Sequence, residues 1–287
     1  MCGIAGSFNG PFLDSKRLEH LKKCLNRRGP DGFGHYFSEA GCQLVHSRLA
    51  IIDLDDRAKQ PFVYGNYVIS FNGEIYNYVE LRARLIGEGF TFRTDSDTEV
   101  LAASWSRWGK GCLNLFDGMW AIAVYDTKTQ ELVLATDAFN EKPLYYCKTS
   151  NEGLCFASRI DALKIVGNLR LEPDFTQISN YLVNGYKSLF KSDRCFISGV
   201  SRLEAGHMLV VRAGHVSKKS YWEPDLTANK YTSDNEAIES TRDELIRSVK
   251  LRLRSDVPLA FCLSGGIDSN ALIGAAVNEC GVKATAF

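Results

Sequence analysis

The chain begins MCGIAGSFNG (residues 1–10), with a cysteine directly after the first methionine. Methionine is readily trimmed before a small second residue, so Cys2 can become the first residue and carry a free α-amine. That amine, with a pKa of about 7.7–8.0, suits a proton acceptor for the thiol at neutral pH. The alternative is that Cys2 is a small buried apolar residue, as most cysteines are. Gly3, Ala5 and Gly6 would allow this strand to lie close against a ligand.

Composition indicates a globular protein with one or two domains, since 45% of its 287 residues are hydrophobic. The 34 basic and 34 acidic residues cancel, so neither nucleic acid nor a membrane surface is an expected partner. Apolar stretches such as MWAIAVY (residues 119–125) are shorter than the roughly 20 residues that span a bilayer. With no secretory signal visible, the nine cysteines are expected to be reduced thiols in the cytoplasm. No metal-ligand spacing occurs among the histidines and cysteines.

Up to about residue 222 the sequence predicts antiparallel sheet with a few helices. Three hairpins are expected, each from two strand-like runs around a polar turn: MWAIAVY with ELVLAT, LYYCK with LCFAS, and HMLVVR with HVSKKSYW. Residues 14–30 predict a helix with Leu18, Leu21 and Leu25 on one face. Another helix is expected to begin at Ser96, with Glu99 at capping-box spacing.

A polar stretch after residue 222 predicts a linker, and the pattern beyond it is α/β. A long helix is expected from four apolar residues on one face: Ile238, Leu245, Val249 and Leu253. VPLAFCL (residues 257–263) predicts a buried strand, and SNALIGAAVNECG (residues 269–281) predicts a helix. Between them SGGIDS (residues 264–269) is either a plain tight turn or a phosphate loop at a helix N-terminus. It lacks the lysine of a Walker A loop.

Six motifs occur in an order and spacing typical of one family: MCGIAG, RRGPDG, HSRLAIID, FNGEIYNY, SDTEV and EKPLYY. They resemble the class II glutamine amidotransferase domain of asparagine synthetases, and SGGIDS resembles the pyrophosphate loop of ATP pyrophosphatases. The resemblance covers essentially the whole chain. It implies an α+β fold, an N-terminal-nucleophile (Ntn) hydrolase αββα sandwich of two stacked antiparallel sheets at residues 2–222. Residues 223–287 would be a linker and the truncated start of an α/β, parallel-sheet ATP-pyrophosphatase domain.

The resemblance also implies roles in glutamine hydrolysis. Cys2 would be the nucleophile, and Asn72 and Gly73 would stabilise the oxyanion of the tetrahedral intermediate. Glutamine is a zwitterion, and three charged residues would bind it: Arg48 at its carboxylate, Glu74 and Asp97 at its ammonium.

Each of these residues has an alternative explanation. Asn72-Gly73 is by itself a strong turn signal. Arg48 and Glu74 are compatible with solvated strand charges, and Asp97 with a helix N-cap. We assign no role to Arg28.

For SGGIDS the resemblance implies that ATP is bound through its pyrophosphate, by Ser264, Gly265, Gly266 and Ser269. Asp268 would hold Mg²⁺ through water or cap the helix, so no metal ligand is certain. ATP and Mg²⁺ are therefore the expected cofactors of the synthetase half. Glutamine hydrolysis is expected to need none.

The function implied is that of a glutamine-dependent asparagine synthetase. Glutamine would be hydrolysed through a γ-glutamyl thioester, and the ammonia would reach an aspartate that ATP has activated as an acyl-adenylate. The products would be asparagine, glutamate, AMP and pyrophosphate. One alternative is a related amidotransferase for another carboxylate, such as a sugar acid or a β-lactam precursor. A thiolating tRNA-modifying enzyme fits poorly with zero net charge, and a non-enzymatic paralogue fits poorly with the intact motifs. A homodimer is compatible with the sequence.

Two residues depart from the family pattern in TDAFNEKPLYY, which has Thr136 in place of arginine and Asn140 in place of glycine. Asparagine tolerates positive φ, so we expect the turn at Asn140 to survive. The chain is also expected to be a fragment, since it stops before the segments that complete the synthetase site in the family.

Overall fold

The computed structural model describes residues 1–149, 153–226, 231 and 233–287. The chain divides into two units: Met1–Ala50 with Asp55–Glu223 form unit 1, and Ile51–Leu54 with Pro224–Phe287 form unit 2. None of the helices in the described ranges is long and apolar enough to cross a membrane.

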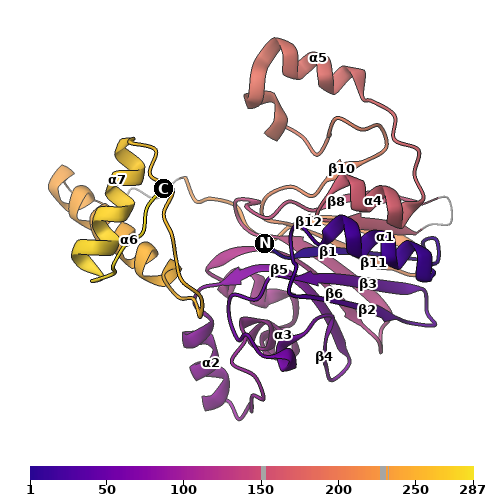
Figure 1. Cartoon of the computed structure of the whole chain (residues 1–287), viewed down its shortest axis with the longest axis horizontal. Helices are drawn as coiled ribbons and strands as arrows, with labels where there is room; N and C mark the ends of the chain where they lie inside the picture. Colours follow the sequence, from indigo (N-terminus) through magenta and orange to yellow (C-terminus); the bar gives the residue numbers. More distant parts are fainter. Residues whose placement is uncertain (150–152, 227–230, 232) are drawn as a thin grey trace. The chain divides into compact units, whose positions relative to one another are not determined.

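Unit 1 is built on two antiparallel sheets of six strands each (Figure 1). The first sheet has, in spatial order, β10 (Ser201–Arg202), β8 (Tyr145–Lys148), β9 (Leu154–Ala157), β1 (Gly3–Phe8), β3 (Cys42–Arg48) and β2 (Gly32–Phe37). The second has β12 (His215–Ser220), β11 (His207–Arg212), β7 (Glu131–Thr136), β6 (Gly118–Asp126), β5 (Tyr67–Ile75) and β4 (Phe62–Tyr64). The three predicted hairpins are confirmed as β6–β7, β8–β9 and β11–β12.

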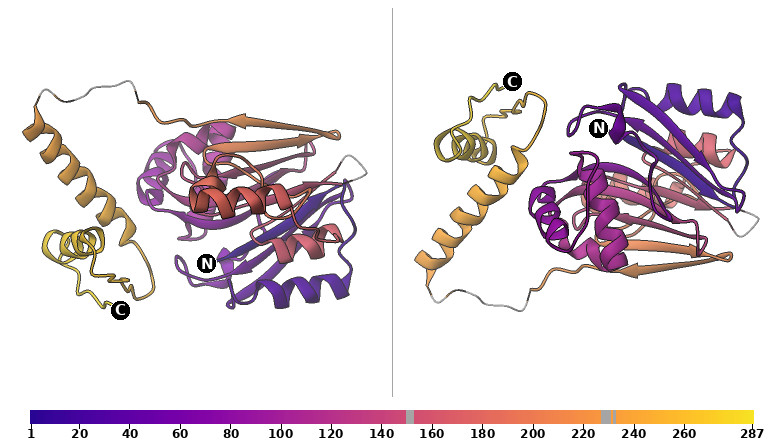
Figure 2. Two further views of the ribbon diagram at one scale, coloured as in Figure 1. Left: turned by 90° about the horizontal axis from the view of Figure 1, so that it is seen from above. Right: turned by 90° about the horizontal axis from the view of Figure 1, so that it is seen from below.

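The two sheets stack face to face around one apolar core (Figure 2). Ile4, Phe8 and Leu44 of the first sheet pack there with residues of the second such as Ala123 and Leu134. Helices cover the outer faces: α1 (Ser15–Leu25) and α4 (Ile160–Gly167) on the first sheet, α2 (Tyr78–Gly87) and α3 (Asp97–Trp108) on the second. This order of layers is the αββα sandwich that the resemblance implies.

The predicted helix at residues 14–30 is confirmed as α1, although it ends earlier, at Leu25. Asp14 caps it by accepting a hydrogen bond from Arg17 N. Leu21 and Leu25 are buried in the core between α1 and the first sheet, as the periodicity predicts. The remaining elements of unit 1 are short or peripheral: η1 (Asp56–Ala58), η2 (Gly109–Leu115), α5 (Phe175–Asn184) and η3 (Gly185–Phe190).

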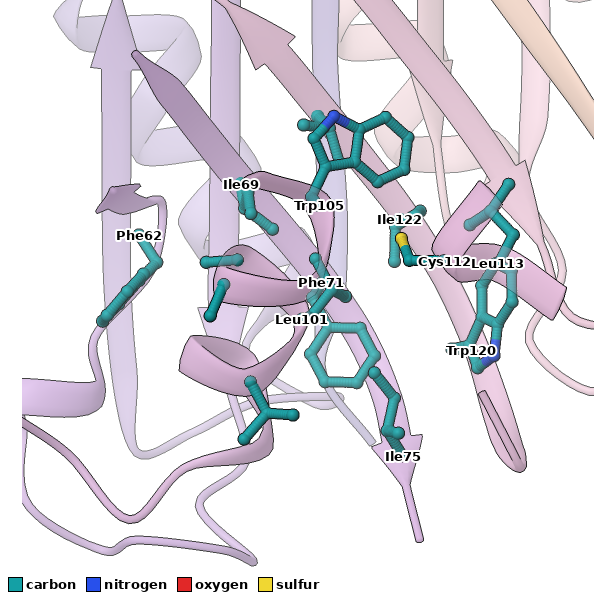
Figure 3. Packing of buried hydrophobic residues seen from close by; sticks show 14 of the residues in the cluster. Phe62, Ile69, Phe71, Ile75, Leu101, Trp105, Cys112, Leu113, Trp120 and Ile122 are labelled. Atoms are coloured by element: carbon teal, nitrogen blue, oxygen red, sulfur yellow. The ribbon is translucent and has the colours of Figure 1, made fainter. Parts of the chain in front are cut away.

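The alternation of side chains along β5 decides which of its residues face the first sheet. Successive side chains of a strand point to opposite faces, so alternate residues share a face. Ile69, Phe71 and Ile75 pack against α3 in the outer core, where Leu101 and Trp105 also lie (Figure 3). The even-numbered residues of β5 must therefore face the first sheet. Asn72 and Glu74 are two of them.

Unit 2 contains α6 (Asp234–Arg252), α7 (Ile267–Gly274) and a π-helical turn, η4 (Ala275–Glu279). The prediction of a buried strand at residues 257–263 is wrong. The segment forms one parallel bridge, Phe261 to Ala286, and Leu259 and Leu263 are exposed.

A parallel strand is stable only when both of its faces are covered. The described part of unit 2 has just three buried residues in its core, Val249, Ala275 and Ala276. For the same reason the predicted apolar face of α6 is buried only near its end, and Ile238 is exposed.

Candidate functional site

Strand pairing brings Cys2 and Arg48 to the same end of the first sheet. Gly3 of β1 pairs with Ser47 of β3, so the residues just beyond this pair are Cys2 and Arg48. The Cys2 Sγ accepts a hydrogen bond from Leu49 N at 3.3 Å, and the thiol also donates to Leu49 O at 3.5 Å. Burial raises the pKa of the Cys2 thiol above its ordinary value. The thiol is therefore protonated at neutral pH, and it needs a base before it can act as a nucleophile.

The RRGPDG motif supports the chain segment that carries Arg48. A Cβ on Gly29 would lie 2.3 Å from Ser47 O, so only glycine allows the chain to pass there. Asp31 N donates to Arg48 O at 2.9 Å, and the Asp31 carboxylate accepts from Ala50 N at 2.9 Å. These contacts hold both sides of the Arg48 backbone.

Arg48 is only 7% exposed, so its interpretation as a solvated strand charge is wrong. Its Nη1 donates to Asp55 O at 2.8 Å, which orients the guanidinium. Arg48 is also close enough to Cys2 to lower the pKa of the thiol, opposing the effect of burial.

Asn72 lies inside β5, so the hairpin-turn interpretation of Asn72-Gly73 is also wrong. The side chain is fully buried, yet neither Nδ2 nor Oδ1 has a hydrogen-bond partner in the described part of the chain. Leaving a buried amide without partners costs about 1–3 kcal/mol. An amide kept at that cost, on the face of β5 that meets the first sheet, is suited to donate to a ligand.

Gly73 contributes a backbone N–H at the open edge of β5. The N–H groups of alternate residues point to the same edge of a strand. Phe71 N donates to Gln60 Oε1 at 2.6 Å, and Ile75 N donates to Asp97 Oδ2 at 3.1 Å, both on the edge away from β6. The Gly73 N–H lies between them on this edge. Glycine is also required here by packing, because a Cβ would lie 2.1 Å from a backbone oxygen of β6.

Hydrogen bonds between the sheets fix β5 opposite β3. Ser70 Oγ donates to Val45 O at 3.2 Å, and His46 Nε2 lies 3.0 Å from Phe71 O. Burial lowers the pKa of His46 to about 4, so the ring is neutral at pH 7. Since a carbonyl oxygen can only accept, Nε2 carries the proton of this neutral ring. These two hydrogen bonds keep the face of β5 that carries the Asn72 side chain against β3.

Asp97 is the first residue of α3, but it is not the N-cap. Ser96 caps the helix by accepting from Thr98 N at 3.0 Å. The second half of the expected capping box is absent, because Glu99 binds Thr94 N instead of Ser96 N. Asp97 is buried, and its carboxylate is used to fix β5 through Ile75 N.

The two acidic residues of the site influence one another. Burial, with a smaller contribution from the nearby Glu74 carboxylate, raises the pKa of Asp97 to about 7, although its backbone hydrogen bonds act to lower it. Glu74 is half-buried, not solvated, and burial raises its pKa while Lys142 and the N-terminal amine lower it. Asp97 also raises the pKa of the Cys2 thiol, so it is close to the nucleophile.

Two basic residues near Cys2 were not assigned from the sequence. Arg28 Nε donates to Cys2 O at 2.8 Å, and Lys142 Nζ lies 3.2 Å from Met1 Sδ. Burial lowers the pKa of the terminal amine on Met1, and both cations lower it further. The sequence feature that could have identified these two residues is their place in two of the motifs, RRGPDG and EKPLYY.

The two departures from the family pattern are accommodated. Asn140 adopts φ 54°, as expected for asparagine in place of glycine, and its Nδ2 donates to Leu203 O at 2.7 Å. Thr136 is buried and its hydroxyl donates to Glu204 O at 2.7 Å.

In unit 2, hydroxyl groups gather at the N-terminus of α7. Ser264 Oγ and Ser269 Oγ are 3.1 Å apart, and Gly266 N donates to Ser264 Oγ at 3.4 Å. Gly265 has φ 77°, with open space around the position of a Cβ. Exposed hydroxyls and amides at a helix N-terminus fit a phosphate group. Asp268 lies in the first turn of the helix. Within the described ranges, no three His, Cys, Asp or Glu side chains gather as a metal site.

Comparison with known proteins finds two families along the chain. Residues 1–222 match the glutamine amidotransferase domain, and residues 240–287 match asparagine synthase. The chain is 35% identical to asparagine synthetase [glutamine-hydrolyzing] 1 of Bacillus subtilis over 96% of its own length and 44% of that protein. It is 34% identical to amidase chry2 of Gibberella zeae over 96% of its length and 42% of that protein. The chain thus spans less than half of each.

The fold also resembles a solved structure, glutamine phosphoribosylpyrophosphate amidotransferase from B. subtilis complexed with ADP and GMP. The TM-score is 0.60 over 99% of this chain and 65% of that one, at 17% sequence identity. The likeness at this level of identity concerns the fold.

Proposed function

Because the chain belongs to the glutamine amidotransferase domain family, we propose that it hydrolyses glutamine, with Cys2 as the nucleophile once Met1 has been removed. The observation that carries the proposal is the Asn72 side chain, which is buried without a partner among the described residues and faces the sheet that ends in Cys2. The Gly73 N–H at the open edge of β5 supplies a second donor. Together they suit an oxyanion, the charge that develops when a thiolate attacks an amide.

In the proposed reaction the α-amine of Cys2 takes the proton of its thiol. Burial raises the pKa of this thiol, so it stays protonated at neutral pH and needs a base. An α-amine with an ordinary pKa of about 7.7–8.0 is suited to be that base. Attack on the glutamine side-chain amide would give a γ-glutamyl thioester and release ammonia, after which water would release glutamate.

Arg48 is proposed to bind the glutamine carboxylate. It is buried and oriented by Asp55 O, so the planar guanidinium is held in one orientation. A guanidinium can bind a carboxylate through two parallel N–H groups. Glu74 and Asp97 are proposed to bind the ammonium. Both carboxyl groups have raised pKa values without a ligand, and a bound ammonium would favour their ionised forms.

The decisive experiment uses Cys2→Ala, with Cys24→Ala as the matched control. Cys24 is also a half-buried thiol of unit 1, and it lies in the last turn of α1. We expect glutamate release from glutamine to be abolished by Cys2→Ala and retained by Cys24→Ala. Mass spectrometry of active protein should find Met1 absent. Wild-type glutamate release by the Cys2→Ala variant, or full activity with Met1 retained, would refute the proposal.

For the second half, we propose that the released ammonia amidates a carboxylate activated by ATP. The match of residues 240–287 to asparagine synthase supports this, and aspartate is the first candidate acceptor. Activation would cleave ATP to AMP and pyrophosphate, and Ser264, Gly265, Gly266 and Ser269 would hold the pyrophosphate. Asp268 would bind Mg²⁺ through water. The cytoplasm is the expected location.

A different carboxylate remains the alternative acceptor, because amidases are among the similar proteins. The test supplies ammonia, ATP and one carboxylate at a time to the enzyme in its full length, and measures pyrophosphate. Release with aspartate supports asparagine synthesis. Release with another carboxylate alone would favour the alternative.

A further inference from the structure

Lys142 is a buried cation without a strong acceptor. The residue is 6% exposed. Over the described ranges, the hydrogen bond found for its Nζ goes to Met1 Sδ at 3.2 Å. A thioether is a weak acceptor. Buried charges are normally paired, because an ammonium loses the solvation of water. Removal of Met1 takes even this acceptor away.

The charged groups that face Lys142 are Glu74, Glu141, Arg28, Asp137 and the terminal amine. The Asp137 carboxylate is occupied by four backbone N–H groups, those of Trp120, Phe139, Glu141 and Lys142 itself. Glu141 is exposed to water. Arg28 is a cation that binds Cys2 O.

Glu74 differs from these neighbours. It is half-buried, and no hydrogen bond to its carboxylate is found among the described residues. The backbone brings Lys142 close to Glu74: Lys142 N and Trp120 N both donate to Asp137 Oδ2, and the neighbour of Trp120, Met119, pairs with Glu74 across the sheet. With Met1 present, no ion pair between Lys142 and Glu74 is found in the described part of the chain, although Lys142 is the cation that acts most strongly on the Glu74 carboxylate. A carboxylate has about four lone-pair sites on two oxygens, so one oxygen can bind an ammonium of the protein while the other binds an ammonium of a ligand.

We propose that Lys142 is a positioning residue for Glu74, and that after Met1 is removed its ammonium binds the Glu74 carboxylate and holds it in place for the ammonium of glutamine. The inference rests on the proposed glutaminase function. It assigns Lys142 no contact with the reacting atoms.

The pairing of Lys142 with Glu74 would make glutamine binding depend on pH. Burial raises the pKa of Glu74, and Lys142 opposes this. Without the cation the pKa of Glu74 rises further, so the carboxyl group is protonated over more of the acidic range. Glutamine would then bind less well at low pH, while the catalytic step at Cys2 would be unchanged.

The test compares Lys142→Met with the wild-type chain after Met1 removal, using kcat and KM for glutamine from pH 6 to pH 8.5. We expect KM to rise at pH 6 by up to about tenfold, the limit that a shift of one pKa unit sets. The ratio of variant to wild-type KM should fall as pH rises, and kcat should stay within about twofold. Lys142→Arg should restore a KM close to wild type. Lys148→Met, at an exposed lysine of β8, is the control and should change neither constant.

A second readout does not need activity. The carboxyl ¹³C shift of Glu74, assigned with Glu74→Gln, should titrate at a higher pH in Lys142→Met than in wild type. If Lys142→Met does not fold, Lys142→Gln removes the same charge and should give the same shift. An unchanged Glu74 titration, a KM ratio that does not vary with pH, or an arginine variant as impaired as the methionine variant would overturn the inference. Absence of wild-type glutamate release together with the expected Glu74 shift would refute the proposed function and leave the pairing intact.

Discussion

Substitution of Asn72 by alanine should separate catalysis from stability. The Asn72 side chain makes no hydrogen bond within the described residues, although it is fully buried. If its amide donates to the oxyanion, it contributes in the transition state and little in the ground state. We therefore expect Asn72→Ala to lower kcat and to leave the KM for glutamine nearly unchanged.

The magnitudes follow from the same geometry. Loss of one oxyanion donor typically costs roughly 10²–10³ in kcat. Within the described ranges Asn72→Ala removes no side-chain hydrogen bond. Removal of an unpaired buried amide relieves a penalty of about 1–3 kcal/mol. The small cavity left by the side chain offsets part of this gain. The free energy of unfolding should accordingly stay level or rise.

Asn77 provides the matched control. Its Nδ2 donates to Leu115 O at 2.9 Å, and its Oδ1 accepts from Asp117 N at 3.0 Å, so both ends of the amide hold loops together. Asn77→Ala should lower the free energy of unfolding by about 1–3 kcal/mol, with a kcat near wild type once the protein is folded.

The assay measures glutamate release at saturating glutamine, and urea unfolding for stability. Asn72→Ala with normal kcat would refute the oxyanion role. A large loss of stability in Asn72→Ala would show that the side chain has a structural partner in solution.

Three further results are expected. Arg48→Ala should raise the KM for glutamine by about 10- to 100-fold, the loss of a charge-assisted contact of about 1.5–3 kcal/mol, and an unchanged KM with a collapsed kcat would contradict the binding role. Asp97 has a pKa raised to about 7, so between about pH 4 and pH 7 the ligand-free folded protein binds more protons than the unfolded chain. The free energy of unfolding should therefore fall as pH rises through that range. Asp97→Asn should flatten this slope, and an unchanged slope in the variant would assign the pH dependence to another group. Amide hydrogens of residues 258–287 should exchange faster than those of β1, β5 and β6, because unit 2 buries only Val249, Ala275 and Ala276 in its described core; slow exchange there would mean that the segment is better covered in solution.

The sequence by itself determined much of unit 1. Alternation and turn residues are local properties, so the three hairpins and the helix at Ser15–Leu25 were predicted in place. The motifs also identified residues that the structure brings to one end of the two sheets. Their roles remain proposals, as does the domain division at residue 222.

Other features depend on contacts between segments that are distant in sequence, and only the tertiary structure decided them. Asn72-Gly73 has the local preference of a turn, but the neighbouring strand β6 holds it in an extended strand. The pKa of Asp97 is raised because α3 and β5 exclude water from it. Lys142 is buried because segments distant in sequence cover it, and its Nζ lies 3.2 Å from Met1 Sδ. Nothing in its own sequence neighbourhood requires this burial.

The segment at residues 257–263 shows the opposite case. Its apolar composition is that of a buried strand, yet Leu259 and Leu263 are exposed. Apolar residues favour burial, but a segment is buried only where other layers cover it, and the described part of unit 2 supplies few side chains to do so. The apolar composition of this segment therefore determined its preference for burial. The tertiary structure determined that the segment stays exposed, because too few side chains cover it.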